Sequence, residues 1–114
     1  MNRKIFLLSS DNDFTSYIHT SALTLTKLNH QINFTDNIND RNIDIIIIDL
    51  DSRGKENLEI IKKIRKSSDT SKIKILAVST SVTEDLKSNV FNAGCDAVMS
   101  KSEFRAAADN ILIF

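Results

Sequence analysis

The sequence predicts an α/β fold: a doubly wound sheet of five parallel strands with helices on both faces. Short apolar runs of strand length alternate with segments in which apolar residues recur every three or four positions. One run, residues 43–50, is apolar on both faces, which is typical of a central strand in a covered sheet. Such alternation indicates parallel strands joined by right-handed crossovers. The length of 114 residues predicts a single domain, residues 1–114, with one core.

The overall composition narrows the classes of function. Fifteen basic residues balance fifteen acidic ones, so the net charge does not favour nucleic acid or an anionic membrane. The single cysteine, Cys95, excludes an internal disulfide and fits a reducing compartment. The apolar run at residues 5–8 is too short for a signal peptide or a membrane span. We therefore expect a cytoplasmic protein with no nucleic-acid or membrane partner.

The first half of the chain predicts a strand, a helix and two further strands. Residues 4–8 form the first apolar run, and residues 31–35 alternate polar and apolar side chains as an edge strand does. Residues 43–50 follow as the central strand. Between the first two strands, apolar residues at three- and four-residue steps predict a helix that Asp11 or Asn12 caps. These apolar residues are Phe14, Tyr17, Ile18, Ala22, Leu25 and Leu28.

The second half of the chain alternates helices with two more strands, at residues 73–78 and 97–99. Two serine–glutamate pairs have the spacing of a capping box, in which the two side chains cap a helix start reciprocally. They are Ser81 with Glu84 and Ser100 with Glu103. The apolar positions of the three predicted helices are Leu58, Ile61 and Ile64, then Leu86 and Val90, then Phe104, Ala108 and Ile111. A basic cluster ends the first of these helices, where the helix dipole favours cations, and we interpret it as a solvated face. Its residues are Lys62, Lys63, Arg65 and Lys66.

The link between the second and third strands is unusually short. Residues 35–42 are too few for a crossover that contains a normal helix. Either the helix there has shrunk to about one turn, or the two strands are not parallel neighbours. In a sheet ordered 2-1-3-4-5 the second strand lies beyond the first, and a short extended link is feasible. We therefore expect a shortened or missing second helix.

Polar residues follow four of the predicted strands. Ligands of open α/β sheets bind just beyond the carboxyl ends of the strands, which selects a small set of side chains. They are Ser9, Ser10, Asp11, Asp49, Asp51, Ser79, Thr80, Ser100 and Lys101. Carboxylates, hydroxyls and one lysine suit a phosphoryl group or a metal with oxygen ligands. The chain has no glycine-rich nucleotide loop and no nucleophile elbow, and its two histidines are too far apart for a helical metal pair.

This ordered set resembles the receiver domain of bacterial response regulators, the two-component signalling family. Asp49 matches the family's phosphoacceptor at the end of strand three. Ser79, thirty residues later, matches its hydroxyl, and Lys101, twenty-two later still, matches its lysine. Gly54, Leu58 and the segment AGCDAVMSK at residues 93–101 also look like the family's. The resemblance covers the whole chain and implies the flavodoxin-like strand order 2-1-3-4-5.

The sequence departs from the family where magnesium binds. The family has two acidic residues at the end of strand one, and here these positions are Ser9 and Ser10. A hydroxyl ligates magnesium without the charge of a carboxylate, so we expect no resident cofactor and at most a weak Mg²⁺ site, with Asp11, Asp49 and Asp51 as its ligands. Further departures affect the loops and the switch. Arg53 and Ser102 replace prolines, Asn57 replaces a glycine, and Val98 replaces the aromatic switch residue.

Two classes of function therefore compete. The first is a pseudo-receiver, a non-enzymatic interaction module that works without phosphorylation. The alternative is a working receiver that a histidine kinase phosphorylates on Asp49. A cofactor-binding enzyme would need a phosphate-binding loop, which this sequence lacks. A folded domain whose pocket has no activity is a further alternative. Because the acidic pair is lost, we expect a standing ion pair between Asp49 and Lys101, with Ser79 donating a hydrogen bond to Asp49.

The resemblance also implies where partners bind. In the family, the surface formed by helix four, strand five and helix five contacts signalling partners, a histidine kinase or an output domain. In this chain that surface covers residues 82–92 and 98–113. We expect a monomer or a weak homodimer.

Overall fold

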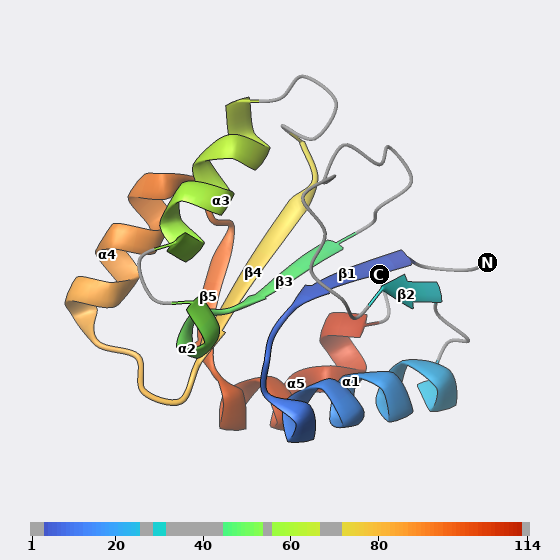
Figure 1. The fold of residues 1–114 in the computed structure, drawn as a ribbon. Helices are drawn as coiled ribbons and strands as arrows, with labels where there is room; N and C mark the ends of the chain where they lie inside the picture. The colour runs from blue at the N-terminus through green and yellow to red at the C-terminus, as the bar shows by residue number, and fades with distance from the viewer. Residues whose placement is uncertain (1–3, 26–28, 32–44, 54–55, 67–71, 113–114) are drawn as a thin grey trace.

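The computed structural model describes residues 4–25, 29–31, 45–53, 56–66 and 72–112, which form a five-stranded sheet with helices on both faces (Figure 1). The elements in chain order are β1 (Lys4–Leu8), α1 (Asn12–Leu25), β2 (Asn29–Gln31), β3 (Ile45–Asp49), α2 (Leu50–Arg53), α3 (Glu56–Lys66), β4 (Lys74–Ser79), α4 (Glu84–Ala93), β5 (Ala97–Ser100) and α5 (Lys101–Leu112). None of the described helices is long and apolar enough to cross a membrane.

The sheet has the predicted order, β2-β1-β3-β4-β5, and every neighbouring pair is parallel. Asp49 pairs with Val78, and Ser79 pairs with Ser100. The carboxyl ends of β3, β4 and β5 therefore lie close together at one edge. Because side chains that follow these strands emerge at that same edge, the register brings Asp49, Ser79 and Lys101 together.

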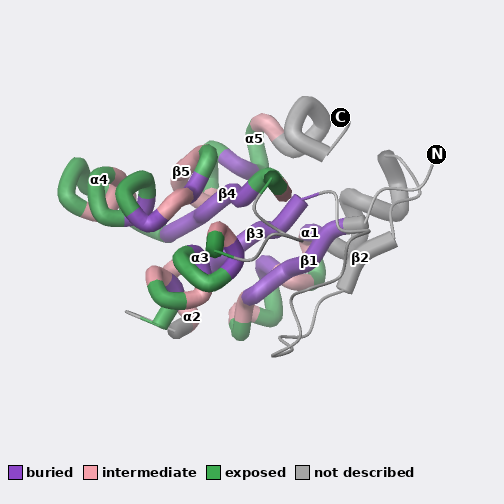
Figure 2. Tube along the Cα trace, turned by 90° about the horizontal axis from the view of Figure 1, so that it is seen from above, coloured by how far each residue is buried: buried purple, intermediate pink, exposed green. Residues whose placement is uncertain are grey.

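Helices cover both faces of the sheet, with α1 and α5 on one face and α3 and α4 on the other (Figure 1). Alternate residues of β3 serve the two cores: Ile45 and Ile47 pack with Phe14, Ile18 and Phe104 of α1 and α5. On the other face, Ile46 and Ile48 pack with Ile61, Ile64 and Val90 of α3 and α4. All five residues of β3 are buried (Figure 2). This double burial explains why the strand is apolar at every position before Asp49.

The helix caps confirm two sequence predictions and correct a third. Asp11 caps α1, since its Oδ1 accepts from the N–H of Phe14 at 3.1 Å. Ser100 and Glu103 form the reciprocal capping box, at 3.1 and 3.0 Å. The capping box predicted for Ser81 and Glu84 is wrong, because Thr83 is the N-cap of α4 and accepts from the N–H of Leu86. Thr83 directly precedes the first helical residue and so occupies the position that a cap requires.

Two strand boundaries differ from the predictions. The third strand ends at Asp49, one residue before the predicted end at Leu50, which instead begins α2. The second strand is described from Asn29 to Gln31, so it begins two residues before the predicted start. Residues 32–35 of that predicted strand, and the shortened helix expected at 35–42, lie outside the described residues. A short helix that was not predicted, α2, directly follows β3. It carries Asp51 and Ser52 to the edge where the candidate residues gather.

Candidate functional site

The site is built around Asp49, the last residue of β3. Its side chain is fully buried. Lys101 begins α5 directly after β5, and its Nζ lies 3.0 Å from Asp49 Oδ2. The expected ion pair is therefore present. Its lysine is 14% exposed and its carboxylate is 0% exposed, so water screens the pair far less than it screens a surface pair.

Lys101 is shared among three carboxylates. Its Nζ also lies 2.9 Å from Asp11 Oδ2 and 3.2 Å from Asp51 Oδ2. The helix cap Asp11 and the α2 residue Asp51 both turn toward the ammonium, so they compete with Asp49 for Lys101. We call these four residues, Asp11, Asp49, Asp51 and Lys101, the carboxylate–lysine cluster.

Hydrogen bonds occupy both oxygens of Asp49. Oδ2 accepts from Ser9 Oγ at 2.7 Å and from Ser52 Oγ at 3.0 Å, and Oδ1 accepts from the N–H of Asp51 at 3.0 Å. Ser10 takes part through its backbone, whose N–H donates to Ser52 Oγ at 2.9 Å. The sequence interpretation missed Ser52. Its spacing of three residues from Asp49, one helical turn, was the signal that would have found it.

Asp51 holds the end of β4. Its carboxylate accepts from Ser79 Oγ at 2.9 Å, from the N–H of Thr80 at 2.9 Å and from Thr80 Oγ1 at 2.7 Å. The predicted hydrogen bond from Ser79 to Asp49 is therefore wrong, because Ser79 donates to Asp51 instead. Burial by itself raises the pKa of Asp51, but the hydrogen bonds from Thr80, Ser79 and Lys101 outweigh it and lower that pKa to about 2.

The charges of the cluster stabilise one another. Burial lowers the pKa of Lys101, but the carboxylates of Asp11, Asp49 and Asp51 more than reverse this and raise the pKa above its usual value. The hydrogen bond from Lys101, together with the N–H of Phe14, lowers the pKa of Asp11. The ammonium and the Asp11 and Asp51 carboxylates are therefore all charged near neutral pH.

The three predicted metal ligands do not fit a divalent cation as they are arranged. Asp11, Asp49 and Asp51 converge on Lys101 Nζ, which fills the position between them. Within the described parts of the chain, no group of three or more acidic, histidine or cysteine side chains has the geometry of a metal site. A metal bound by these carboxylates would have to displace the ammonium.

Two predicted pocket residues lie elsewhere or play other roles. Val98 packs against the core beneath α3 and α4. Ser100 caps α5 together with Glu103, and its Oγ lies 3.1 Å from Ser102 Oγ. Ser9, Ser10, Asp11, Asp51, Ser79 and Thr80 all contact Asp49, its partners or the lysine. The structure thus brings together most of the predicted site.

Solved structures with a similar fold include several response regulators. The phosphorylated cyanobacterial phytochrome response regulator RcpA is 17% identical over 97% of this chain and 91% of its own, with a TM-score of 0.81. The Mn²⁺-bound form of response regulator Rcp1 is 16% identical over 98% and 93%, with a TM-score of 0.80. An orphan response regulator of H. pylori is 16% identical over 96% of each chain, with a TM-score of 0.69.

The chain has the receiver fold. No family model matches the sequence, and no curated protein matches it either. The likeness to solved structures therefore lies in the fold of the backbone. The receiver fold was predicted from the positions of Asp49, Ser79 and Lys101 in the sequence, and the structural neighbours confirm that fold.

Proposed function

We propose that this chain is a pseudo-receiver: a cytoplasmic, non-enzymatic interaction module of two-component signalling that works without phosphorylation of Asp49. The observation that carries the proposal is the position of Lys101 Nζ among three carboxylates. Phosphoryl transfer to a carboxylate needs a cation to offset the repulsion between two anions. Here the chain's own ammonium holds that place, and Ser9 and Ser10 supply none of the acidic charge that would bind a metal.

The state of Asp49 supports the same reading. An attacking carboxylate needs a path for the phosphoryl donor. Asp49 is fully buried, and its Oδ2 accepts from Ser9 and Ser52 while it contacts Lys101. A unit charge pair at about 4 Å contributes roughly 4 kcal/mol at an effective dielectric near 20. Opening the ion pair to admit a metal would cost free energy of that order.

The residues that would move on phosphorylation are held in place. Ser79 and Thr80 are both bound to Asp51, which ties the end of β4 to α2. The aromatic side chain of the family's switch is replaced by Val98, which packs into the core. A single stable conformation suits a module that is recognised by its surface. By resemblance, the partner is a signalling protein, a histidine kinase or an output domain that contacts α4, β5 and α5.

The alternative is a working receiver that a histidine kinase phosphorylates on Asp49. One observation favours it: Asp49 keeps the position at the end of β3 and the contact with the lysine after β5. In this alternative, Lys101 would leave the carboxylates when a metal and a phosphoryl group arrive. The two functions therefore differ in a measurable response to metal and phosphoryl mimic.

The test is an NMR titration of the ¹⁵N-labelled chain with millimolar Mg²⁺ and beryllofluoride, a phosphoryl mimic. We expect the amide signals of Asp49, Ser79 and Lys101 to stay unchanged. The matched control is the Ser9→Asp/Ser10→Asp variant, which restores two acidic side chains beside Asp49 and should respond to both additions. Shifts of these amides in the unmodified chain, as large as those in the variant, would establish the phosphorylated receiver instead.

A further inference from the structure

Donors from two other elements converge on the carboxylate of Asp51. Ser79 Oγ donates to Oδ1 at 2.9 Å, and the N–H and Oγ1 of Thr80 donate to Oδ2 at 2.9 and 2.7 Å. Lys101 Nζ lies 3.2 Å from the same Oδ2. Hydroxyls, a backbone N–H and an ammonium together are a donor set that binds the oxygens of anions. We call Ser79, Thr80 and Lys101 the donor residues.

The donor residues are held together without Asp51. Ser79 ends β4, Thr80 follows it, and Lys101 begins α5 directly after β5. The pairing of Ser79 with Ser100 joins the ends of β4 and β5. Asp51 comes from a different segment, the short helix α2 that follows β3. Its carboxylate is therefore placed among the donor residues as a bound anion would be.

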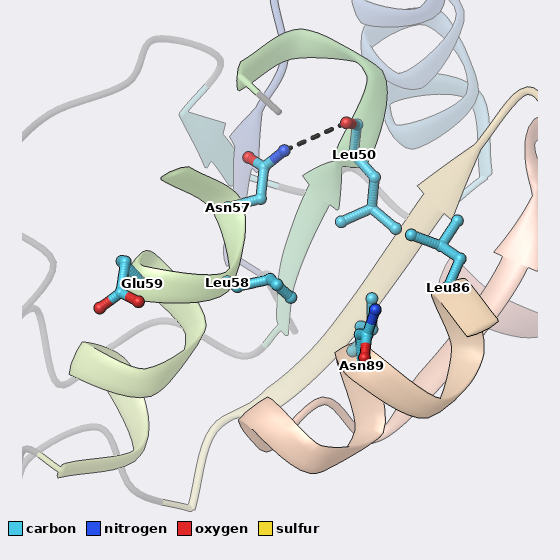
Figure 3. Close-up of a pocket in the computed structure, with 7 residues that line it drawn as sticks. Leu50, Asn57, Leu58, Glu59, Leu86 and Asn89 are labelled. Atoms are coloured by element: carbon cyan, nitrogen blue, oxygen red, sulfur yellow. Dashed lines mark hydrogen bonds between the residues drawn. The ribbon is translucent and has the colours of Figure 1, made fainter. Parts of the chain in front are cut away.

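The short helix α2 is anchored on its other side. Nδ2 of Asn57, in α3, donates to the carbonyl oxygen of Leu50, the residue before Asp51, at 3.2 Å (Figure 3). The side chain of Leu50 points toward Leu86 of α4, and both line the groove between α3 and α4 (Figure 3). These contacts hold α2 without the help of Asp51. Its carboxylate therefore reaches the donor residues from a segment that is already in place.

The place of the Asp51 carboxylate is open to water, in contrast to that of Asp49. Asp51 is 36% exposed and Thr80 is exposed as well, whereas Asp49 is fully buried. A small anion could therefore reach the donor residues if the side chain of Asp51 were removed. Lys101 also contacts Asp11 and Asp49, so a monoanion would restore the original charge of the cluster. An anion of higher charge would be repelled by these two carboxylates.

The connection between β4 and α4 starts at the donor residues. Thr80 begins this connection and Thr83, the N-cap of α4, ends it. Ser79 Oγ also lies 3.1 Å from the carbonyl oxygen of Ser81, so its single proton is divided between that carbonyl and Asp51. Without the carboxylate, this proton is free for Ser81, and the N–H of Thr80 loses Asp51 as its acceptor. An anion among the donor residues therefore favours one conformation of the connection.

We propose that the donor residues form an oxyanion site and that Asp51 is its built-in carboxylate ligand, which holds the connection between β4 and α4 in one conformation. Because the carboxylate is tethered to the chain, its effective concentration at the site is high, and no external anion is needed. The oxyanion site does not depend on the proposed function. Its regulatory meaning does, since α4 belongs to the surface that we expect partners to contact.

The test is chemical rescue of Asp51→Ala with formate, which supplies the missing carboxylate as a separate molecule. We expect Asp51→Ala to shift the amide signals of Thr80 and Thr83 in the ¹⁵N-labelled chain, and that of Leu86 less. Formate, added up to about 100 mM to replace a tethered group, should return these signals toward their original positions along a saturable curve. Chloride at equal ionic strength should not, because a single spherical ion does not provide two oxygens for separate donors.

Three variants locate the rescue. Asp51→Asn keeps the site filled by a side chain of the same size, so formate should have no effect on it. Asp51→Ala/Thr80→Val lacks one hydroxyl donor, and formate should bind to it about tenfold more weakly than to Asp51→Ala. Asp13→Ala, at an exposed aspartate in the first turn of α1, should neither shift the amide of Thr80 nor respond to formate.

Several outcomes would overturn the proposal. They are signals of Thr80 and Thr83 that Asp51→Ala leaves in place, shifts that formate does not reverse, and equal reversal by chloride. If Asp51→Ala is unfolded without an added anion, circular dichroism provides the readout. Refolding by formate but not by chloride then supports the oxyanion site, and equal effects of the two salts overturn it.

Failure of this test is separate from failure of the proposed function. If formate rescues Asp51→Ala and the unmodified chain also responds to Mg²⁺ with beryllofluoride, the chain has the oxyanion site and is a phosphorylated receiver. If neither response occurs, the chain is a pseudo-receiver in which other contacts hold the connection between β4 and α4.

Discussion

At each of the two edges of the sheet, one cation binds groups from several elements, and the two sites differ in their balance of charge. At the carboxyl edge, Lys101 meets three carboxylates. At the amino edge, Arg65 of α3 donates to the carbonyl oxygens of Gly94 and Ile73, both at 2.6 Å, and to the carboxylate of Asp96. The carboxylate of Asp96 also accepts from the N–H of Ile75 at 2.8 Å. We call this amino-edge group the arginine staple.

The difference lies in the balance of charge at the two edges. In the arginine staple, the planar guanidinium directs separate N–H groups to oxygens of fixed position, and among these contacts one positive charge meets one negative charge. In the carboxylate–lysine cluster, one positive charge meets three negative ones. Such an excess of negative charge has a cost in free energy, because the carboxylates repel one another. The following substitutions test the contrast between the balanced arginine staple and the unbalanced cluster.

The largest effect is expected for Lys101→Ala. It leaves Asp49 buried without its cation, with Asp11 and Asp51 close by, and should lower the free energy of unfolding by about 3 kcal/mol. Urea unfolding followed by circular dichroism measures this change. In the Lys101→Ala/Asp49→Asn double variant the buried charge is gone as well, so the loss should fall to about 1 kcal/mol. An unchanged unfolding midpoint in Lys101→Ala would show that the ion pair contributes nothing to stability.

The next effect concerns the arginine staple. Arg65→Ala should cost about 2 kcal/mol, because it removes charge-assisted hydrogen bonds from a partly exposed network. Gly94→Ala should cost about as much, since Gly94 has φ 120° and an added Cβ would lie 2.5 Å from Arg65 Cγ. Thermal unfolding of both single variants and of the double variant tests this. If the clash with Arg65 matters, Gly94→Ala costs clearly less in the Arg65→Ala background, whereas full additivity would assign its cost to φ alone.

The sequence predicted the sheet and its order because that information is local and repetitive. Because β3 is buried on both faces, its residues must be apolar until the strand ends at Asp49. The spacing from Asp49 to Ser79 and Lys101 follows from the lengths of the strands and helices between them. The cap at Asp11 and the capping box at Ser100 were also readable, since each depends on residues only three apart.

The details of the site were not readable, because side chains from different elements choose among several partners. Ser79 follows both Asp49 and Asp51 by a long stretch of chain, so sequence separation does not choose between them. The turn of α2 decides that Ser79 donates to Asp51. The recruitment of Asp11 by Lys101 spans ninety positions. The arginine staple was hidden for the same reason, since a basic cluster at a helix end gives no hint that one arginine turns back onto Gly94, Ile73 and Asp96.

Low pH should weaken the contribution of the carboxylate–lysine cluster to the stability of the fold. The pKa of Asp51 is lowered from 3.8 to about 2, and the pKa of Asp11 is lowered as well. A carboxylate with a lowered folded pKa stabilises the fold above its unfolded value, near pH 4, and this contribution is lost as the pH falls toward 2. Lys101 adds no pH dependence in this range, because its raised pKa acts only in strong base.

Asp51→Asn should therefore flatten the loss of stability between pH 4 and pH 2, the range over which the lowered pKa of Asp51 acts. Because Asp51 is 36% exposed, solvent screening reduces the contribution to about 1 kcal/mol. Urea unfolding at several pH values measures it. The matched control is Asp85→Asn, an exposed helix-start aspartate outside the cluster for which no such flattening is expected. Parallel curves for Asp51→Asn and the unmodified chain would contradict the assigned hydrogen bonds.

The smallest effect is expected for Ser52→Ala, which tests a residue that only the structure revealed. The variant removes one of the hydroxyl donors to Asp49 Oδ2 and the acceptor for the N–H of Ser10. Because Ser9 and Lys101 still contact the same oxygen, the loss in unfolding free energy should be only about 1 kcal/mol. Ser102→Ala, at an exposed hydroxyl beside Ser100, is the matched control and should change less. If Ser52→Ala instead destabilised the fold as much as Lys101→Ala, the hydroxyls rather than the ammonium would hold Asp49 in place, and the contrast between the two edges would rest on hydrogen bonds instead of charge.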